Sequence, residues 1–261
     1  MTRTPRCYPL ISTTAPEATT RNAAIAYLRL GFRPIPLWGL DPRSTPERPV
    51  CSCEAIAIAR DAAAVGARAR RRPHCGETLH VCPSPNCPAH SNDTPGTVHS
   101  GAGKHPRYSG WERGDLNESD VDRIWRSSYG VGLVMGPCAI GDLVAIDVDG
   151  ATGRASLRGL RERLGRLPDT LTAQTGSGGV HFVYRVTSEP NLLTNRGRAQ
   201  GSKLTIPGID LRARGIGGGA GQIAVSPTMH WSGRRYRWTH PLMPVELPSE
   251  WYAELVRLTV R

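Results

Sequence analysis

The feature that most constrains this chain is a strongly apolar run that ends in two acidic residues, LVAIDVDG at residues 143–150. Such a run is typical of a β-strand. Side chains alternate along a strand, so the carboxylates of Asp147 and Asp149 are expected to project from one face. Two close carboxylates repel each other unless a cation lies between them, and Mg²⁺ or Mn²⁺ prefers such oxygen ligands. The alternative is a strand end that meets solvent, with Gly150 starting a turn.

A second segment, TGSGGVHFVYRV at residues 175–186, predicts a glycine-rich turn followed by a strand. Backbone N–H groups of a turn at Ser177, Gly178 and Gly179 suit a phosphate. His181 follows on the strand, where an imidazole would face the same anion. The alternative is an ordinary hairpin that carries a half-buried histidine.

A third segment, GIDLRARG at residues 208–215, predicts a short strand with Asp210 and Arg212 on one face. A third carboxylate and a guanidinium would complete a site for a metal ion and a phosphate. The alternative is a surface ion pair, which contributes little to stability.

The expected elements mix helices, strands and hairpins. This order favours an α+β fold over a doubly wound parallel sheet. Prolines in residues 32–38 restrict that short strand to a sheet edge. Helices are expected at 20–30, 118–127 and 151–165 and from about Ser249, and strands at 131–136, 143–149, 171–186 with its turn, 204–213 and 222–227.

Residues 41–110 concentrate five of the seven cysteines and five of the eight histidines. Cysteines this dense in a cytoplasmic chain indicate bound metal. The C-x-C pair of Cys51 and Cys53 is close enough to supply two ligands of a tetrahedral Zn²⁺. The later candidates are Cys75, Cys82, Cys87, His90 and His105, and the spacing does not say which of them bind.

The net charge of +11 favours an anionic partner such as nucleic acid, nucleotide or phosphate. All but two of the 33 basic residues are arginines, which is also typical of a GC-rich coding source, so both interpretations stay open. No apolar run is long enough to span a bilayer. Residues 1–20 lack the apolar segment of a secretory signal, so we expect a cytoplasmic protein.

Taken in order, these segments resemble the primase-polymerase (prim-pol) branch of the archaeo-eukaryotic primase superfamily, which plasmids, phages and integrated elements often encode. The resemblance runs from about residue 24 to residue 238. Its anchors are GFRPIPL, GKHPRYSGW, GVGLVMG, LVAIDVDG, TGSGGVHFVY, GIDLRARG and IAVSPTMHWSGRRYRW. A P-loop of the kind that helicase-bearing relatives carry is not among them, so we expect no helicase activity from this sequence.

The resemblance implies a role for each matching position. Asp147, Asp149 and Asp210 would bind two Mg²⁺ or Mn²⁺ ions, and with His181 they form the expected catalytic set. The nucleotide-binding set would comprise Ser177, Gly178, Gly179, His181 and Arg212.

The resemblance also implies a structural zinc ion. Related sequences carry a C-x-C…C…G-K-H-P stretch, which here corresponds to Cys51, Cys53, Cys87 and His105. The long insert between Cys53 and Cys87 departs from that pattern and keeps Cys75 and Cys82 as candidates.

The implied fold is a prim-pol core in which an N-terminal αβ module packs against an RRM-like catalytic module, with a zinc-binding insertion at about 50–106. We expect a loose leader at 1–20, a catalytic domain at 21–245 and a C-terminal helix at 246–261. The active site would lie in the cleft between the modules.

The implied activity is template-dependent nucleotidyl transfer: primer synthesis, primer extension, or both. Its partners would be single-stranded DNA, dNTPs or NTPs, and a separate replicative helicase. The alternatives are a non-catalytic DNA-binding initiator that keeps the fold, a nuclease that uses the same carboxylates, and a plain zinc-binding interaction protein.

Overall fold

The computed structural model describes residues 19–40, 44–46, 52, 102–107, 111–113, 116–187, 193, 206–214 and 221–259. Within these ranges the chain is α+β, as expected, with antiparallel sheets and four α-helices. The helices are α1 (Thr20–Arg29), α3 (Glu118–Ile124), α4 (Gly150–Leu164) and α5 (Ser249–Thr259), with a short 3₁₀ turn η2 (Trp111–Arg113). None of the described helices is long and apolar enough to cross a membrane.

A small sheet of three described strands has the order β1-β2-β8. It contains β1 (Pro34–Leu37), β2 (Gly130–Val134) and β8 (Gln222–Ala224). The prediction of an edge strand at 32–38 is confirmed, since β1 lies at one end of the described strand order and, among the described residues, its outer side carries only an isolated bridge from Leu37 to Pro106. This position suits a strand whose prolines lack N–H donors.

A larger sheet of six described strands has the order β3-β4-β6-β5-β9, and β7 also pairs with β4. Its strands are β3 (Gly136–Cys138), β4 (Gly141–Val148), β5 (Leu171–Gln174), β6 (Val180–Val186), β7 (Ile209–Arg212) and β9 (Arg237–His240). β3 and β7 share one edge of β4, because β3 pairs with residues 141–143 and β7 with residues 145–148. β4 is therefore the central strand, and its carboxyl end lies between β6 and β7.

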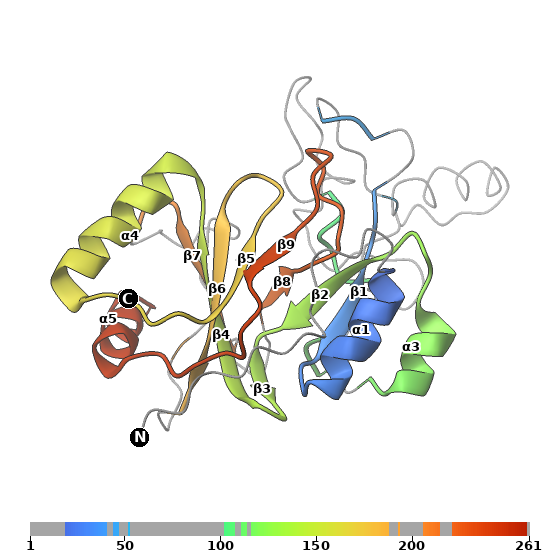
Figure 1. Ribbon diagram of the computed structural model, residues 1–261, viewed down its shortest axis with the longest axis horizontal. Helices are drawn as coiled ribbons and strands as arrows, with labels where there is room; N and C mark the ends of the chain where they lie inside the picture. Colours follow the sequence, from blue (N-terminus) through green and yellow to red (C-terminus); the bar gives the residue numbers. More distant parts are fainter. Residues whose placement is uncertain are drawn as a thin grey trace, which may run out of the picture.

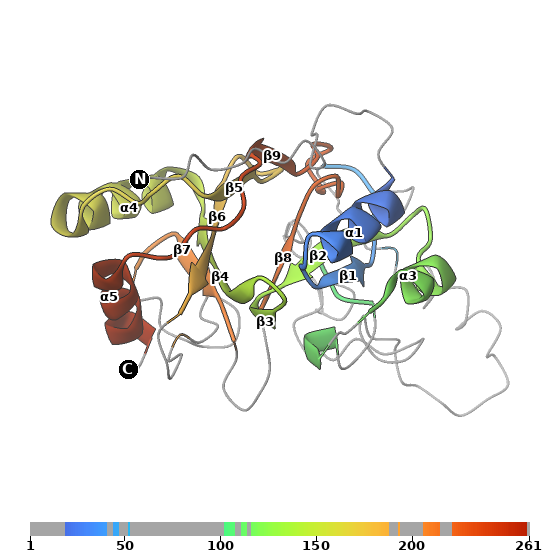
Figure 2. The same cartoon turned by 60° about the horizontal axis from the view of Figure 1, so that its bottom comes forward.

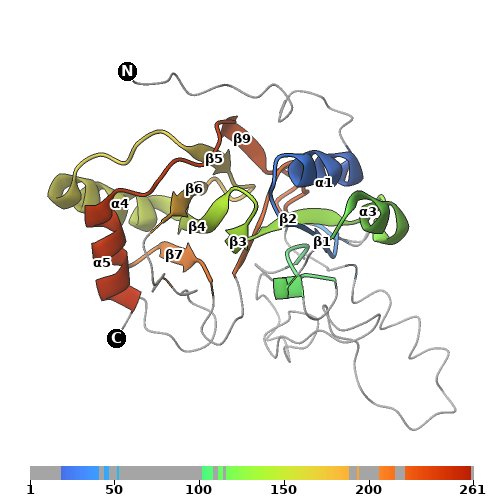
Figure 3. The same cartoon turned by 90° about the horizontal axis from the view of Figure 1, so that it is seen from below.

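The two faces of the larger sheet pack against different partners. Leu143 and Ala145 of β4 join α1, α3 and the small sheet in one core, while Val144 and Ile146 join α4 and α5 in another. Figure 1 shows α4 and α5 on one side of the larger sheet and α1 with α3 at the opposite end of the molecule, an arrangement that Figures 2 and 3 keep. The alternation expected for this strand is thus present.

Some boundaries differ from the expected ones. The helix predicted over 118–127 ends at Ile124, because Trp125 is extended and its indole N–H donates to Thr20 Oγ1 at 3.1 Å. The strand predicted over 204–213 is only Ile209–Arg212. β3 was not expected, since its residues form a turn-like connection in the sequence. The predicted leader at 1–20 lies almost entirely outside the described residues.

Candidate active site

Asp147 lies in register between a histidine and a second aspartate. It is paired with His181 on β6 and with Asp210 on β7, so the side chains of all three stand on one face of the sheet. This is the face that packs toward α1 and the small sheet. The structure therefore brings together three predicted residues that are up to 63 positions apart in the sequence.

Asp147 is surrounded by cations. Its Oδ1 lies 3.3 Å from His181 Nε2, and the two side chains are 15% and 6% exposed. Burial raises the pKa of the Asp147 carboxyl, but His181, Arg212 and Lys104 outweigh burial and hold that pKa below its usual value. Asp147 Oδ1 is inaccessible and has no well-aligned hydrogen bond within the described ranges. The carboxylate is thus ionised at neutral pH.

Asp149 occupies the turn from β4 into α4. It is the N-cap residue of α4, with extended backbone angles and no side-chain capping bond. The alternation of β4 therefore continues for one residue past the end of the strand. Burial, and then the charge of Asp147, raise the pKa of the Asp149 carboxyl above its usual value. The two carboxylates repel each other, as two acidic residues expected to share a cation should.

Asp210 and Arg212 form an ion pair on β7. Arg212 Nη2 donates to Asp210 Oδ2 at 3.0 Å, and the two side chains are 28% and 19% exposed. The expected placement of both residues on one strand face agrees with the alternating burial of β7. Arg212 also lowers the pKa of Asp147, so its guanidinium stabilises the charges of two acidic residues, Asp147 and Asp210.

The glycine-rich turn connects β5 to β6 beside Asp149. The N–H groups of Gly178 and Gly179 donate to the carbonyl oxygen and Oγ1 of Thr175, so both are used within the turn. The hydroxyl of Ser177, which is exposed, also contacts Thr175 Oγ1. A Cβ at Gly179 would lie 2.7 Å from Asp149 Oδ1, so only glycine lets the turn approach that carboxylate. The phosphate cradle expected from these N–H groups would need the turn to rearrange.

A histidine that the sequence analysis did not single out fixes this turn. His230 packs on Gly176 so closely that a Cβ there would lie 2.1 Å from His230 Cβ. Ser232 Oγ donates to the carbonyl oxygen of Gly176 at 2.8 Å, and the Ser232 N–H donates to His230 Nδ1 at 3.1 Å. Burial, with Lys104 and Arg234, lowers the pKa of His230 to about 4. His230 is thus a neutral side chain that carries its proton on Nε2.

Lys104 is a second residue that the sequence analysis left without a role. Its pKa is lowered by burial, although the charges of Asp147 and Asp149 raise it, and its carbonyl oxygen accepts from Gln222 Nε2 at 2.9 Å. One sequence signal could have found it: Lys104 is one of two lysines among 33 basic residues. In a chain where arginine is the default cation, a lysine marks a position that needs a compact charge.

The acidic group fits a divalent cation by its donors. It offers hard carboxylate oxygens, and the mutual repulsion of Asp147 and Asp149 is one that a cation would relieve. Within the described ranges, however, no three His, Cys, Asp or Glu side chains already stand in metal-binding positions. Asp147 and Asp210 instead contact His181 and Arg212. Metal binding would therefore require small side-chain rotations.

The zinc prediction falls mostly outside the described residues. Cys51, Cys53, Cys75, Cys82 and Cys87 all lie there. His105 is described, and its carbonyl oxygen accepts from the N–H of Trp38 at 2.8 Å. This contact anchors the 102–107 segment, and with it Lys104, to the small sheet.

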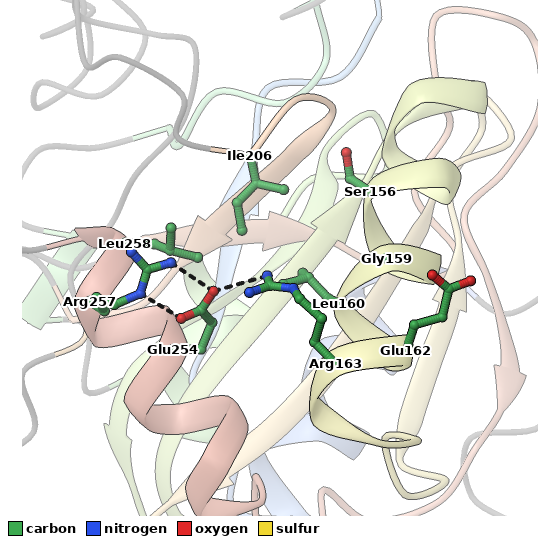
Figure 4. Close-up of a pocket in the computed structure, with 9 residues that line it drawn as sticks. All are labelled: Ser156, Gly159, Leu160, Glu162, Arg163, Ile206, Glu254, Arg257 and Leu258. Atoms are coloured by element: carbon green, nitrogen blue, oxygen red, sulfur yellow. Dashed lines mark hydrogen bonds and ion pairs between the residues drawn. The ribbon is translucent and has the colours of Figure 1, made fainter.

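A hollow of about 470 Å³ between α4 and α5 is separate from the acidic group (Figure 4). At its centre Glu254 accepts from both Arg257 and Arg163, and these two arginines, against the opposite effect of burial, lower the pKa of Glu254 to about 2. The charges of Glu162, Arg163, Glu254 and Arg257 balance. The contacts are those of a structural ion cluster that joins the two helices.

One protein-family model, "Bifunctional DNA primase/polymerase, N-terminal", matches residues 24–251. This range covers most of the chain and contains every described residue of the acidic group. A search of curated proteins found no match.

Proposed function

The chain belongs to the bifunctional DNA primase/polymerase family, and we propose that it carries out template-directed nucleotidyl transfer with Asp147, Asp149 and Asp210. The observation that carries this proposal is the register of β4. It sets Asp147 between His181 and Asp210, beside Asp149, in a group lined by cations. Such a mixture of carboxylates and cations suits a substrate that is a triphosphate bound with a divalent metal.

The chain's own residues would have distinct tasks. Asp147, Asp149 and Asp210 would hold two Mg²⁺ or Mn²⁺ ions, which lower the pKa of the attacking 3′-OH and stabilise the leaving pyrophosphate. His181, Lys104 and Arg212 would bind the phosphate oxygens and offset the charge that develops there. Ser177, with Gly178 and Gly179 beside it, would contact the nucleotide from the turn that His230 and Ser232 fix.

The topology supports the RRM-like module of the proposal. The segment β4-α4-β5-β6-β7 gives the spatial order β7-β4-β6-β5, with every neighbouring pair antiparallel. α4 covers the face away from the acidic group. The proposal also retains the zinc ion at Cys51, Cys53, Cys87 and His105, with Cys75 and Cys82 as alternative ligands.

The proposed partners are a single-stranded DNA template, dNTPs or NTPs, and a separate helicase, in cytoplasmic replication of a plasmid, phage or integrated element. Template binding would rest on arginine contacts to phosphates. It should weaken steeply with salt and show little preference for sequence.

The test is nucleotide incorporation on primed and unprimed single-stranded templates, with Mg²⁺ or Mn²⁺. Asp147→Asn should lower incorporation by at least about 100-fold, because it removes a negative charge that would hold the divalent metal ions. Asp142→Asn is the matched control on the same strand, since Asp142 pairs with Arg214 at 3.3 Å, away from the group. Equal activity in the Asp147→Asn variant and the wild type would contradict the proposal.

A non-catalytic initiator is the second candidate, since Asp147 and Asp210 already contact His181 and Arg212. Salt-sensitive DNA binding that ignores nucleotide and Mn²⁺, with no incorporation, would favour it. Degradation of labelled DNA without nucleotides would instead indicate a nuclease.

A further inference from the structure

A second pocket, of about 260 Å³, opens on the face of the larger sheet that points away from Asp147. Its walls come from the C-terminal part of α4, from the connection to β5, and from β5, β6 and β9. The volume is close to the lower end of the ~300–1,000 Å³ range of small-molecule sites. We call it the outer pocket and define it by Arg161, Arg166, Asp169, Phe182, Tyr184 and His240.

Phe182 gives the outer pocket an aromatic wall. It pairs with Thr172 on β5, which pairs with His240 on β9, so these three side chains form one row across the sheet. Phe182 packs with the helix-side core but is only half-buried, whereas the next residue, Val183, faces the opposite core. The half-buried ring is therefore on the far side of the sheet from His181.

One arginine contacts this ring, and a second lines the same pocket. The guanidinium of Arg161 lies 5.9 Å from the Phe182 ring centroid, within the range of a cation–π contact. Arg161 forms no ion pair within the described ranges. Arg166 lies 3.6 Å from Asp169, with both side chains largely exposed, which is a weak pairing. The outer pocket is thus lined by two arginines, Arg161 and Arg166, and by a single acid, Asp169.

We propose that the outer pocket binds one nucleotide of a single strand of nucleic acid, with the base against Phe182 and its phosphates on Arg161 and Arg166. An aromatic ring beside arginines is the combination that binds single strands without regard to sequence, since every base has a face that can stack. Exposed arginines at 154 and 158 continue the basic surface along α4, each about one helical turn from the next. The strand would therefore run from the outer pocket along α4.

The outer pocket is separate from the acidic group of Asp147, Asp149 and Asp210, which lies on the opposite face of the larger sheet. The inference rests on the chemistry of the outer pocket alone, and it stands even where no incorporation is detected. In a polymerase it would hold template or product outside the active site, and in an initiator it would be a principal DNA contact.

The chain offers a direct probe, because Phe32 and Phe182 are its only phenylalanines. Fluorophenylalanine labelling should give two ¹⁹F resonances, which Phe182→Leu assigns. Adding an oligo(dT) of about 12 nucleotides should shift or broaden the Phe182 resonance. Phe32 is 2% exposed, so its resonance should stay unchanged and serve as the internal control.

Charge is tested by fluorescence anisotropy with the same labelled oligonucleotide. Arg161→Gln with Arg166→Gln should weaken binding severalfold and reduce the slope of log K against log salt by about 1.4, because two phosphate contacts are lost. Arg163→Gln is the matched control, as it removes a charge from the same helix but pairs with Glu254 at 3.0 Å. It should change the affinity much less.

Four results would overturn the proposal. One is oligonucleotide binding that leaves the Phe182 resonance unmoved, and another is no oligonucleotide binding at all. The third is an equal loss of affinity in the Arg163→Gln control. A Phe182 shift caused by a single dNTP but not by the oligonucleotide would also contradict it, since the occupant would then be a free nucleotide.

Discussion

Asp147 and His181 face each other across β4 and β6, with 3.3 Å between Asp147 Oδ1 and His181 Nε2. The contact puts an acid and a base side by side on a nearly dry sheet face. It also depends on backbone pairing alone, since both residues lie inside strands with continuous register. The carboxylate and the imidazole therefore share one strand face before any substrate arrives, although metal binding would still require the Asp147 side chain to rotate.

Gly176→Ala should disrupt the turn that approaches Asp149. The new Cβ would lie 2.1 Å from His230 Cβ, so either the turn or His230 must move. We expect a loss of about 1–3 kcal/mol in the free energy of unfolding, as in overpacked cores, together with weaker nucleotide binding. Urea unfolding and nucleotide titration measure the two effects.

The matched control makes the same substitution at Gly159, inside α4, where an added Cβ meets open space. Gly159→Ala should stabilise the protein by about 0.5–1 kcal/mol, because alanine loses less backbone entropy in a helix. Opposite signs for the two variants are expected, and a loss of stability at both positions would show that the His230 contact is not the cause.

Lys104 should titrate below an ordinary lysine. Burial lowers the pKa of its ammonium more than Asp147 and Asp149 raise it. Reductive ¹³C-methylation labels both lysines and the N-terminal amine, and Lys104→Arg identifies the resonance of interest. That resonance should move at a lower pH than the signal of a free lysine methylated in the same way. Titration of Lys104 at the pH of the free lysine would remove it from the acidic group.

Lys104→Met should separate stability from function. The pKa of Lys104 is lower in the folded state than in the unfolded state, so the charged ammonium destabilises the folded state at every pH below its folded-state pKa. Removing this charge should therefore raise the free energy of unfolding at neutral pH. Nucleotide affinity should fall by about tenfold, the usual order for one charged contact. A variant that loses both stability and affinity would indicate a structural role instead.

The ion cluster between α4 and α5 should make the free energy of unfolding depend on pH in the acidic range. Arg257, followed by burial in the opposite sense and by Arg163, brings the pKa of Glu254 to about 2. The ion pairs of Glu254 therefore add to the free energy of unfolding. This added stability is fully present above the unfolded pKa of about 4.3 and is lost as the pH falls toward 2. Glu254→Gln should therefore cost about 1 kcal/mol at pH 7, a figure reduced by the exposure of both arginines.

Urea unfolding of wild type and Glu254→Gln at several pH values measures this effect. The difference between them should shrink steadily below about pH 4. A difference that stays constant down to pH 2 would mean that lost packing, and not charge, explains the variant.

Patterns of hydrophobic residues were enough to predict the helices and most strands. β4 was predictable because its apolar run is long and its alternation continues to Asp149. The boundaries of α3 were not, because its end depends on the hydrogen bond from Trp125 to Thr20, more than a hundred residues away. β3 was missed for a related reason: a three-residue strand exists only because β4 pairs with it.

In the candidate site, too, some residues could be predicted from the sequence and others could not. Asp147, Asp149, His181 and Asp210 could be selected because each follows or lies in a recognisable strand. His230 could not, since its contact with Gly176 joins two loops by packing and leaves no periodic signal. The ion pair of Arg212 with Asp210 was predictable as an alternative, but its influence on Asp147 depends on the pairing of β7 with β4.

The alternation of β4 also restricts how this strand can change in evolution. Leu143 and Ala145 share a face with Asp147, while Val144 and Ile146 fill the core beneath α4 and α5. Inserting or deleting one residue upstream in β4 would turn Asp147 into the helix-side core and bring an apolar side chain opposite His181. Length variation within the strand is therefore restricted to steps of two residues, and single-residue changes should accumulate only in the connections at its ends.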